Sequence, residues 1–336
     1  MSTVKKATLL TLAAVVIFGL GGLTARALPK LNSALTALWD KPTSENWRKD
    51  ITVVEIPSQD SGEVQYAYAH LVQSQELKPL VVSLHAWMDD YRKTDPLSVL
   101  VADESWNYIH PDFQGPNWTK EACLSEKALN DIDTAIDYAI EHGAVDPDNI
   151  FIVGASGGGY ATLGAYLKSK HKVKGFQSWV PISDLTAWYY QTLDRNYPFA
   201  EDILKCTSDG KTLDPHSAKQ RSPLFWELKD SPNGTLDIYA GIEDGYTGSV
   251  PVSHSILFYN KLVLEYGYPE AIVSDKEITS ILSRGVAPLS PKKYIGGREV
   301  LFSRGVPEVN IRIFKGGHEI LRDHVLFRLK QLYENS

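Results

Sequence analysis

The sequence predicts an α/β fold with a doubly wound, mostly parallel sheet of eight strands and a lid inserted after the sixth strand. Apolar runs typical of buried strands alternate with stretches in which apolar residues recur at helical spacing. That alternation is typical of a parallel sheet covered by helices on both faces. The chain has 336 residues, 43% of them hydrophobic, which is enough to bury the core of one large domain.

Eight runs have the composition of strands. Residues 51–56 and 64–72 are separated by the turn-forming SQDSG and form a predicted antiparallel pair. The six later runs are apolar almost throughout, as expected of strands buried on both faces. They span residues 79–85, 106–111, 149–154, 175–181, 235–241 and 309–314.

Helical periodicity fills most of the intervals, with clear examples over residues 125–142, 252–266 and 318–333. Two longer stretches interrupt the alternation. Residues 184–228 are rich in aromatic side chains and are the predicted lid, because an insertion of that length is usually functional. Residues 267–307 contain one helical and one strand-like piece, and the sequence assigns them no role.

The N-terminal residues have the pattern of an export signal. Two lysines precede an apolar run of about nineteen residues, and Ala25-Arg26-Ala27 has the form of a cleavage site. We therefore expect a signal peptide over 1–27, an approach segment over 28–50 and the main domain over 51–336. Cleavage gives a periplasmic or secreted protein, whereas an uncleaved segment around residues 7–25 would anchor it to a membrane.

Charge and cysteine content exclude some classes of function. The net charge of −7 argues against nucleic acid as a partner, since gripping phosphates needs a basic face. Cys123 and Cys206 lack the close Cys or His spacing of a zinc site, so no metal is expected. In an oxidising compartment they could pair, or both could be small buried residues, and the sequence leaves these two alternatives open.

The turn Gly154-Ala155-Ser156-Gly157-Gly158 follows the predicted strand NIFIV and precedes a helical stretch. This strand-turn-helix context is what a nucleophile elbow requires, because glycines on either side of the serine avoid a clash in a very tight turn. The alternative is a glycine-rich turn that binds an anion or nothing. The context favours Ser156 as a nucleophile, with the amide of Gly157 at a helix N-terminus helping to bind an oxyanion.

A serine nucleophile needs a base held by a carboxylate. His318 directly follows the last core strand in the glycine loop FKGGHE, and Asp244 follows the strand TLDIYAG. The chain order Ser156, Asp244, His318 is that of a known class of catalytic triad. Asp184 and Glu243 remain alternatives for the acid.

His85 and His254 are the two other histidines that could serve as the base in place of His318. His85 ends the third strand and is expected to shape the following loop, and His254 is expected to be a packed or hydrogen-bonded neighbour. The loop after His85 should supply a second oxyanion donor, for which the backbone amide of Trp87 is the first choice and that of Ala86 the second.

These residues resemble the α/β-hydrolase superfamily and, within it, the catalytic domain of the prolyl oligopeptidase (peptidase S9) family with its esterase-like stand-alone relatives. The matching pieces, which fall within residues 51–333, are LHAW, WNYIHPDFQGPN, GASGGGY, GIEDGYTGSVPVSH and FKGGHE. The resemblance implies a triad of Ser156, Asp244 and His318, hydrolysis through an acyl-enzyme, and neither cofactor nor metal.

The resemblance leaves the scissile bond open. Full prolyl oligopeptidases carry a β-propeller of at least ~160 residues, and about two dozen residues separate Ala27 from the first strand. On that ground we expect a carboxylesterase, with a serine peptidase as the alternative and a non-catalytic binding protein as a remote one. Expected substrates are small molecules, carbohydrate esters or peptides. Lid aromatics such as Trp188, Tyr189 and Tyr190 could stack on a sugar ring, or they could form the core of the lid itself. Arg195 in the lid is expected to face solvent rather than pair with a substrate carboxylate.

Overall fold

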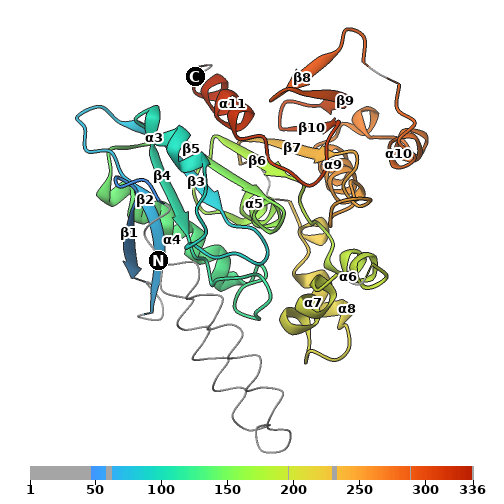
Figure 1. Cartoon of the computed structure of the whole chain (residues 1–336), viewed down its shortest axis with the longest axis horizontal. Helices are drawn as coiled ribbons and strands as arrows, with labels where there is room; N and C mark the ends of the chain where they lie inside the picture. The colour runs from blue at the N-terminus through green and yellow to red at the C-terminus, as the bar shows by residue number, and fades with distance from the viewer. Residues whose placement is uncertain (1–46, 58–62, 196, 229–232, 288, 335–336) are drawn as a thin grey trace, which may run out of the picture. The chain divides into compact units, whose positions relative to one another are not determined.

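The computed structural model describes residues 47–57, 63–195, 197–228, 233–287 and 289–334 (Figure 1). The predicted signal peptide over 1–27 and nearly all of the approach segment over 28–50 lie outside these residues. Among the described helices, none is both long and apolar enough to cross a membrane.

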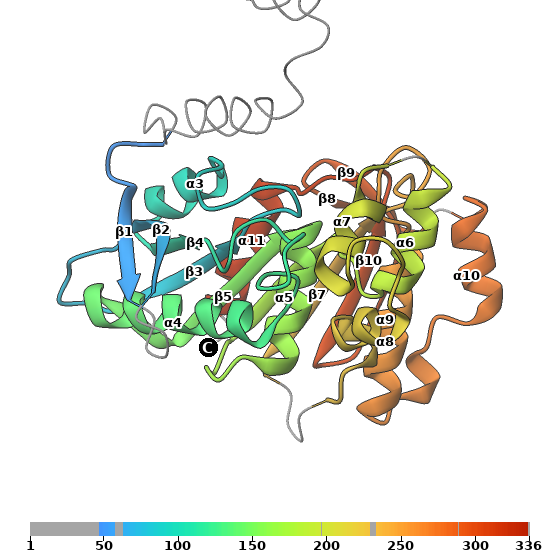
Figure 2. The same ribbon diagram turned by 90° about the horizontal axis from the view of Figure 1, so that it is seen from below.

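The described strands form one ten-stranded sheet in the order β1-β2-β4-β3-β5-β6-β7-β10-β9-β8 (Figures 1 and 2). The eight predicted strands correspond to β1–β7 and β10, so the predicted count of eight is wrong. The two additional strands, β8 and β9, form an antiparallel hairpin within the unassigned stretch and extend the sheet beyond β10. The bounds are β1 Thr52–Pro57, β2 Val64–His70, β3 Lys78–Leu84, β4 Asn107–Pro111, β5 Val145–Ala155, β6 Gly175–Trp179, β7 Thr235–Gly241, β8 Lys293–Ile295, β9 Arg298–Gly305 and β10 Val309–Phe314.

The six central strands, β4-β3-β5-β6-β7-β10, are mutually parallel, and antiparallel strands flank them on both sides. Alternate residues of the central strands enter two different hydrophobic clusters. Leu80 and Val82 of β3 pack in one cluster, whereas Val81 packs in the other. The near-continuous apolar runs in the sequence therefore reflect burial on both faces of the sheet.

Helices cover each face. On one side, α3 (Leu97–Asp103) and α11 (Arg322–Glu334) pack against each other and against the cluster that contains Val81. On the other side lie α4 (Glu126–His142), α5 (Gly157–Lys168) and α9 (Ser253–Glu265). The sheet is thus doubly wound, as predicted.

The insertion between β6 and β7, predicted to be a lid and called so below, consists of short helices: α6 (Leu185–Leu193), α7 (Phe199–Thr207), α8 (Pro215–Gln220) and the 3-10 turn η2 (Pro223–Phe225). Beyond α9, the second insertion contains η3 (Pro269–Ala271) and α10 (Asp275–Leu282) before the β8–β9 hairpin.

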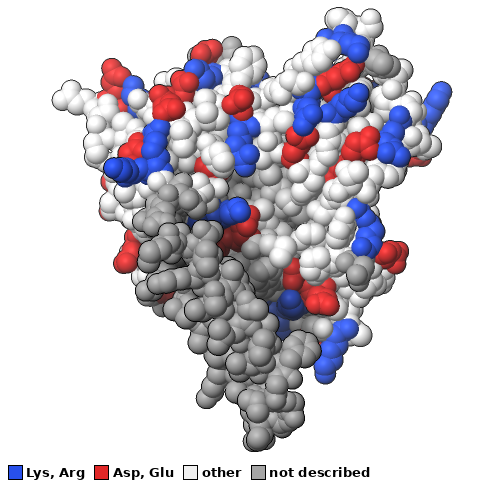
Figure 3. Space-filling model, in the orientation of Figure 1, with Lys and Arg blue, Asp and Glu red and all other residues white. Residues whose placement is uncertain are grey.

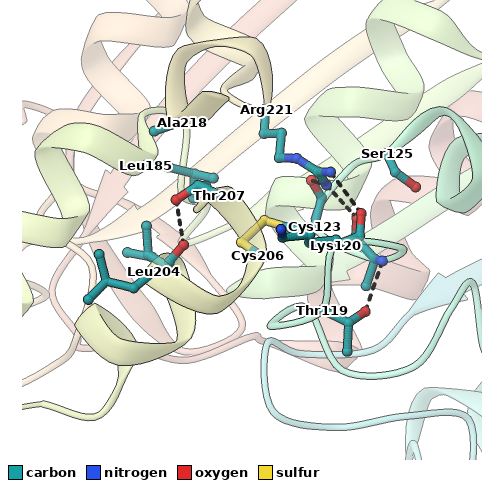
Figure 4. Close-up of a disulfide and its surroundings, with 12 residues drawn as sticks. Thr119, Lys120, Cys123, Ser125, Leu185, Leu204, Cys206, Thr207, Ala218 and Arg221 are labelled. Atoms are coloured by element: carbon teal, nitrogen blue, oxygen red, sulfur yellow. Dashed lines mark hydrogen bonds between the residues drawn. A yellow bond between two sulfur atoms is a disulfide. The ribbon is translucent and has the colours of Figure 1, made fainter. Parts of the chain in front are cut away.

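A disulfide between Cys123 and Cys206 joins α7 of the lid to the loop before α4 (Figure 4). Arg221, which follows α8, reaches the same loop: its guanidinium donates hydrogen bonds to the carbonyl oxygens of Lys120, Ala122 and Cys123 at 2.7 to 3.1 Å. The lid is therefore fastened to the core covalently and by hydrogen bonds at the same place.

Candidate active site

Ser156 occupies the turn between β5 and α5 in the left-handed region, with φ of 58°. A serine in this region is uncommon, and it persists here because the turn is overdetermined by its neighbours. Its amide donates to the carbonyl oxygen of Trp179 at 2.9 Å. A Cβ on Gly154 would lie 2.2 Å from the carbonyl oxygen of Gly158, so the turn closes only because Gly154 lacks a side chain. This is the geometry of a nucleophile elbow.

Asp244 and His318 form a hydrogen-bonded pair. His318 Nδ1 lies 2.7 Å from Oδ2 of Asp244, which is 1% exposed. The other oxygen of Asp244 accepts hydrogen bonds from the amides of Gly245 at 3.0 Å and Val250 at 3.1 Å. The carboxylate is thus held by three donors, and it in turn fixes the orientation of the imidazole.

The topology brings Ser156, Asp244 and His318 to one edge of the sheet. They follow β5, β7 and β10, which belong to the parallel run β5-β6-β7-β10 and so end at the same edge. Among the described residues, no hydrogen bond joins Ser156 to His318, whose side chain is 25% exposed. Such bonds are often long in the free enzyme and tighten when substrate binds.

The two expected oxyanion donors lie against each other. A Cβ on Gly157 would be 2.3 Å from the amide nitrogen of Trp87, so the two backbone segments touch. Neither amide donates a hydrogen bond to another described residue, whereas the carbonyl of Trp87 accepts one from the amide of Asn117 at 2.9 Å. Two free amides side by side next to Ser156 form an arrangement suited to a developing negative charge.

The alternative residues are engaged elsewhere. Asp184 caps α6 by accepting from the amides of Thr186 and Ala187, and Glu243 pairs with Arg284 at 2.8 Å. The backbone amide of Asp184 donates to Nδ1 of His254 at 3.4 Å, but among the described residues neither the Asp184 nor the Glu243 carboxylate is hydrogen-bonded to or paired with a histidine.

The two other candidate histidines are also committed. His85 has its ring nitrogens 3.0 Å and 2.9 Å from the carbonyl oxygens of Ala86 and Asp112. His254 is buried and contacts the amide of Ser183 and the side chain of Gln191. His254 is therefore a packed, hydrogen-bonded neighbour, as the sequence suggested.

The lid holds the loop that carries Asp244. The guanidinium of Arg195 donates to the carbonyl oxygen of Gly248 at 2.6 Å, and Trp188 Nε1 donates to that of Ser249 at 2.9 Å. The expectation that Arg195 faces solvent is therefore wrong. Gly248 is a further site residue that the sequence did not single out: a Cβ there would lie 2.2 Å from Oδ1 of Asp244 and 2.7 Å from Cβ of His318.

Aromatic side chains form an apolar wall beside the oxyanion donors. The ring of Trp188 lies 4.8 Å from that of Trp87 and 4.9 Å from that of Phe199, and Trp188 is fully buried. Trp188 therefore belongs to the core of the lid and is not free to stack on a sugar ring, while Tyr190 is 56% exposed.

The described residues include no group of three or more His, Cys, Asp or Glu side chains placed to hold a metal ion. On the face shown in Figure 3, basic and acidic side chains of the described residues are interspersed and do not gather into one patch.

Residues 107–273 match the model of the prolyl oligopeptidase family. A comparison with curated proteins finds no match. Among solved structures, the chain is similar to an acylaminoacyl peptidase in complex with Z-Gly-Gly-Phe-chloromethyl ketone, at 18% identity and a TM-score of 0.56 over 85% of this chain and 41% of that one.

Two further structures show the same likeness. One is an acylaminoacyl peptidase of Pyrococcus horikoshii, with 17% identity, a TM-score of 0.57 and coverage of 84% of this chain and 40% of that chain. The other is a puromycin-hydrolyzing peptidase of Mycobacterium tuberculosis, with 17% identity, a TM-score of 0.54 and coverage of 84% and 38%.

The chain thus spans about two fifths of the length of these proteins. At this level of identity the solved structures show the fold of the chain. The family match covers residues 107–273. The chain therefore has the fold of the α/β-hydrolases, and its residues 107–273 match the prolyl oligopeptidase family, whose members are serine hydrolases.

Proposed function

We propose that the chain is a serine peptidase that cleaves amide bonds of short, N-blocked peptides through a Ser156-His318-Asp244 triad. The observation that carries the proposal is the convergence of an elbow serine and a carboxylate-held histidine at one edge of the sheet. The comparisons favour this peptidase activity over the carboxylesterase activity expected from the sequence, because similar structures are peptidases, one of them bound to a peptide-like chloromethyl ketone.

The proposed reaction is acyl transfer. Because Asp244 accepts from Nδ1 of His318, Nε2 presents its lone pair and can take the proton of Ser156 as Oγ attacks the carbonyl carbon. The amides of Gly157 and Trp87 bind the oxyanion. Collapse of the tetrahedral intermediate breaks the carbon–nitrogen bond, and His318 passes its proton to the departing amine. Water then attacks the acyl-enzyme with His318 again as the base, which releases the acid and restores Ser156.

The acyl side of the substrate would face the lid. Of the rings that pack together beside the proposed oxyanion donor, those of Trp87 and Trp188 are buried, and the partly exposed ring of Phe199 is the apolar surface that a substrate would meet. We therefore expect a preference for an apolar residue on the acyl side of the scissile bond, since apolar contact area contributes binding free energy at that position.

The test compares Z-Gly-Gly-Phe p-nitroanilide with p-nitrophenyl acetate and an acetylated sugar. We expect anilide cleavage by the wild-type chain, loss of at least about 10³-fold in the Ser156→Ala variant, and fluorophosphonate labelling at Ser156 only. Ser156→Ala should fold normally, because the serine side chain donates no hydrogen bond to another described residue. Hydrolysis of the esters without the anilide would restore the carboxylesterase assignment, and absence of labelling would favour a binding protein.

We also propose that the enzyme works outside the cytoplasm. The apolar run near the N-terminus supports export, and the Cys123–Cys206 disulfide is of a kind that persists in oxidising compartments. Fractionation of cells that express the full chain would test this, with cytosolic recovery of reduced protein as the contrary outcome.

A further inference from the structure

A hollow of about 120 Å³ opens beside the proposed nucleophile. Its lining includes Gly154 and Ala155, the two residues before Ser156, and Ala86, the residue before the proposed oxyanion donor. Ala155 directly precedes Ser156, and its side chain is a single methyl group, so the hollow reaches close to the proposed nucleophile. Ser156, Asp244 and His318 do not themselves line this space.

The position of the hollow relative to His318 identifies the part of the substrate that would enter it. In acyl transfer the histidine gives its proton to the departing group, so that group leaves beside the imidazole. Ile320 and Arg322, two and four residues after His318, line the hollow. The ring of Trp87 instead packs against Trp188 of the lid. The hollow therefore lies on the leaving-group side.

The hollow carries charges of both signs. Lys93 is exposed and has no ion pair among the described residues, and Asp89 also contributes to the lining. Arg322 donates from Nε to Oδ1 of Asp95 at 3.4 Å, while its side chain is 39% exposed and its two terminal nitrogens donate to no described residue. The two cations are thus available to an anion at the rim.

Asp95 does not compete strongly for those cations. Its carboxylate already accepts hydrogen bonds from the hydroxyls of Ser83 at 2.6 Å and Tyr108 at 2.8 Å, and from the amide of Leu97 at 3.0 Å. These neutral donors satisfy most of the acceptor capacity of the Asp95 carboxylate. Asp89 therefore supplies the negative charge at the rim.

A buried histidine gives independent evidence for a polar occupant. His110 lines the hollow and is 3% exposed, and its Nδ1 lies 2.7 Å from the carbonyl oxygen of Ser83. Nδ1 therefore carries the proton, and Nε2 is a buried acceptor without a partner among the described residues. Burial lowers the pKa of His110 to about 4, so the ring is neutral at pH 7. An N–H or O–H donor in the hollow would satisfy it.

We infer that this hollow is the leaving-group subsite and that it takes an amino-acid residue with a free carboxylate, held at the rim by Lys93 and Arg322. The inference rests on the proposed peptidase function. An amino acid leaves amide hydrolysis as a zwitterion at neutral pH, and a rim with Lys93, Arg322 and Asp89 matches both of its charges. The expected substrates therefore end one residue beyond the scissile bond.

The test uses two substrates that differ only at that end, Z-Phe-Gly and Z-Phe-Gly amide, with release of glycine or glycinamide as the readout. We expect the wild type to cleave the acid about fivefold better than the amide in kcat/KM, a preference that weakens in high salt because the rim charges are exposed. Lys93→Gln should bring the ratio close to one, and the Lys93→Gln/Arg322→Gln double variant should reverse it. A general loss of activity cancels from the ratio.

Lys172→Gln is the matched control, since Lys172 is an exposed lysine paired with Asp148 and does not line the hollow. It should keep the wild-type ratio. Cleavage of Z-Gly-Gly-Phe p-nitroanilide reports the proposed function separately. If the anilide is cleaved but acid and amide substrates react equally, or if Lys93→Gln leaves the preference intact, the subsite assignment is wrong while the peptidase assignment stands.

Discussion

Oδ2 of Asp244 lies 2.7 Å from Nδ1 of His318, 74 residues further along the chain. An ionised carboxylate only accepts hydrogen bonds, so Nδ1 is the protonated nitrogen and Nε2 is left with the lone pair that the proposed base needs. The amides of Gly245 and Val250 hold the other carboxylate oxygen, so the carboxylate has little freedom to turn. The pair is therefore set for proton transfer before substrate arrives.

Asp244→Asn should prevent His318 from acting as the base while preserving the fold. The amide oxygen of asparagine would stay with the backbone amides of Gly245 and Val250, and its NH2 group would face Nδ1 of His318. Nδ1 would then have to accept, which leaves the proton on Nε2 and removes the base. We expect kcat for the p-nitroanilide to fall on the order of 10⁴-fold with an unchanged unfolding midpoint. Glu243→Gln is the control, and a large loss there with little loss in Asp244→Asn would reverse the choice of acid.

Gly248→Ala should damage the active site more than the fold. The added Cβ would meet Oδ1 of Asp244 at 2.2 Å and Cβ of His318 at 2.7 Å, so at least one of the two must move. Because a displacement of about 1 Å can cost about 10²-fold in rate, we expect a loss of that order in kcat/KM. Gly285→Ala is the control for replacing a glycine by alanine. Gly285 is exposed, and a Cβ there would lie 3.4 Å from its nearest neighbour, Oγ of Ser283. Comparable losses in both variants would count against the packing argument.

Removal of the Cys123–Cys206 disulfide should lower stability. The bond closes a loop of 83 residues and ties α7 to the core, and disulfides of this kind contribute about 2–4 kcal/mol to the free energy of unfolding. We expect the Cys123→Ala/Cys206→Ala variant to lose about that amount in urea denaturation. Reductant should destabilise the wild type and have no further effect on the double variant. Two titratable thiols in the unreduced wild-type chain would contradict the pairing.

Much of the site could be predicted because its residues follow strands that the sequence marks clearly. Ser156 and His318 stand in glycine-rich turns directly after apolar runs, and strand order then gives the acid. The contact between Arg195 and Gly248 could not be predicted, because it joins the turn after α6 of the lid to a loop 53 residues away and depends on how the lid folds back. The pairing of the two cysteines likewise required the distance between them.

Errors in the fold have similar causes. Helix α3 has only seven residues, too few to show helical periodicity, and β8 has three. The β8–β9 hairpin lies at an edge, where one-sided burial weakens the apolar run that revealed the central strands.

His254 should make the lid sensitive to acid. Its ring is buried between Ser183 and Gln191, and burial lowers its pKa from the ordinary histidine value of 6.5 to about 3. Between these values the unfolded chain binds a proton that the folded chain does not, so the free energy of unfolding falls as pH drops through this window. The stability that the neutral His254 contributes is fully present above pH 6.5. As pH falls below 6.5 it decreases by up to about 1.4 kcal/mol per pH unit.

His254→Gln should remove this dependence. Glutamine does not titrate, so the variant is expected to be less stable at pH 7, because the contact with the amide of Ser183 is altered, yet to lose stability more slowly than the wild type between pH 6.5 and 4. Urea denaturation at half-unit pH steps measures both slopes. His216→Gln, at an exposed position of α8, controls for the removal of a histidine from the lid. Parallel curves for wild type and His254→Gln would show that His254 takes up its proton without unfolding the lid.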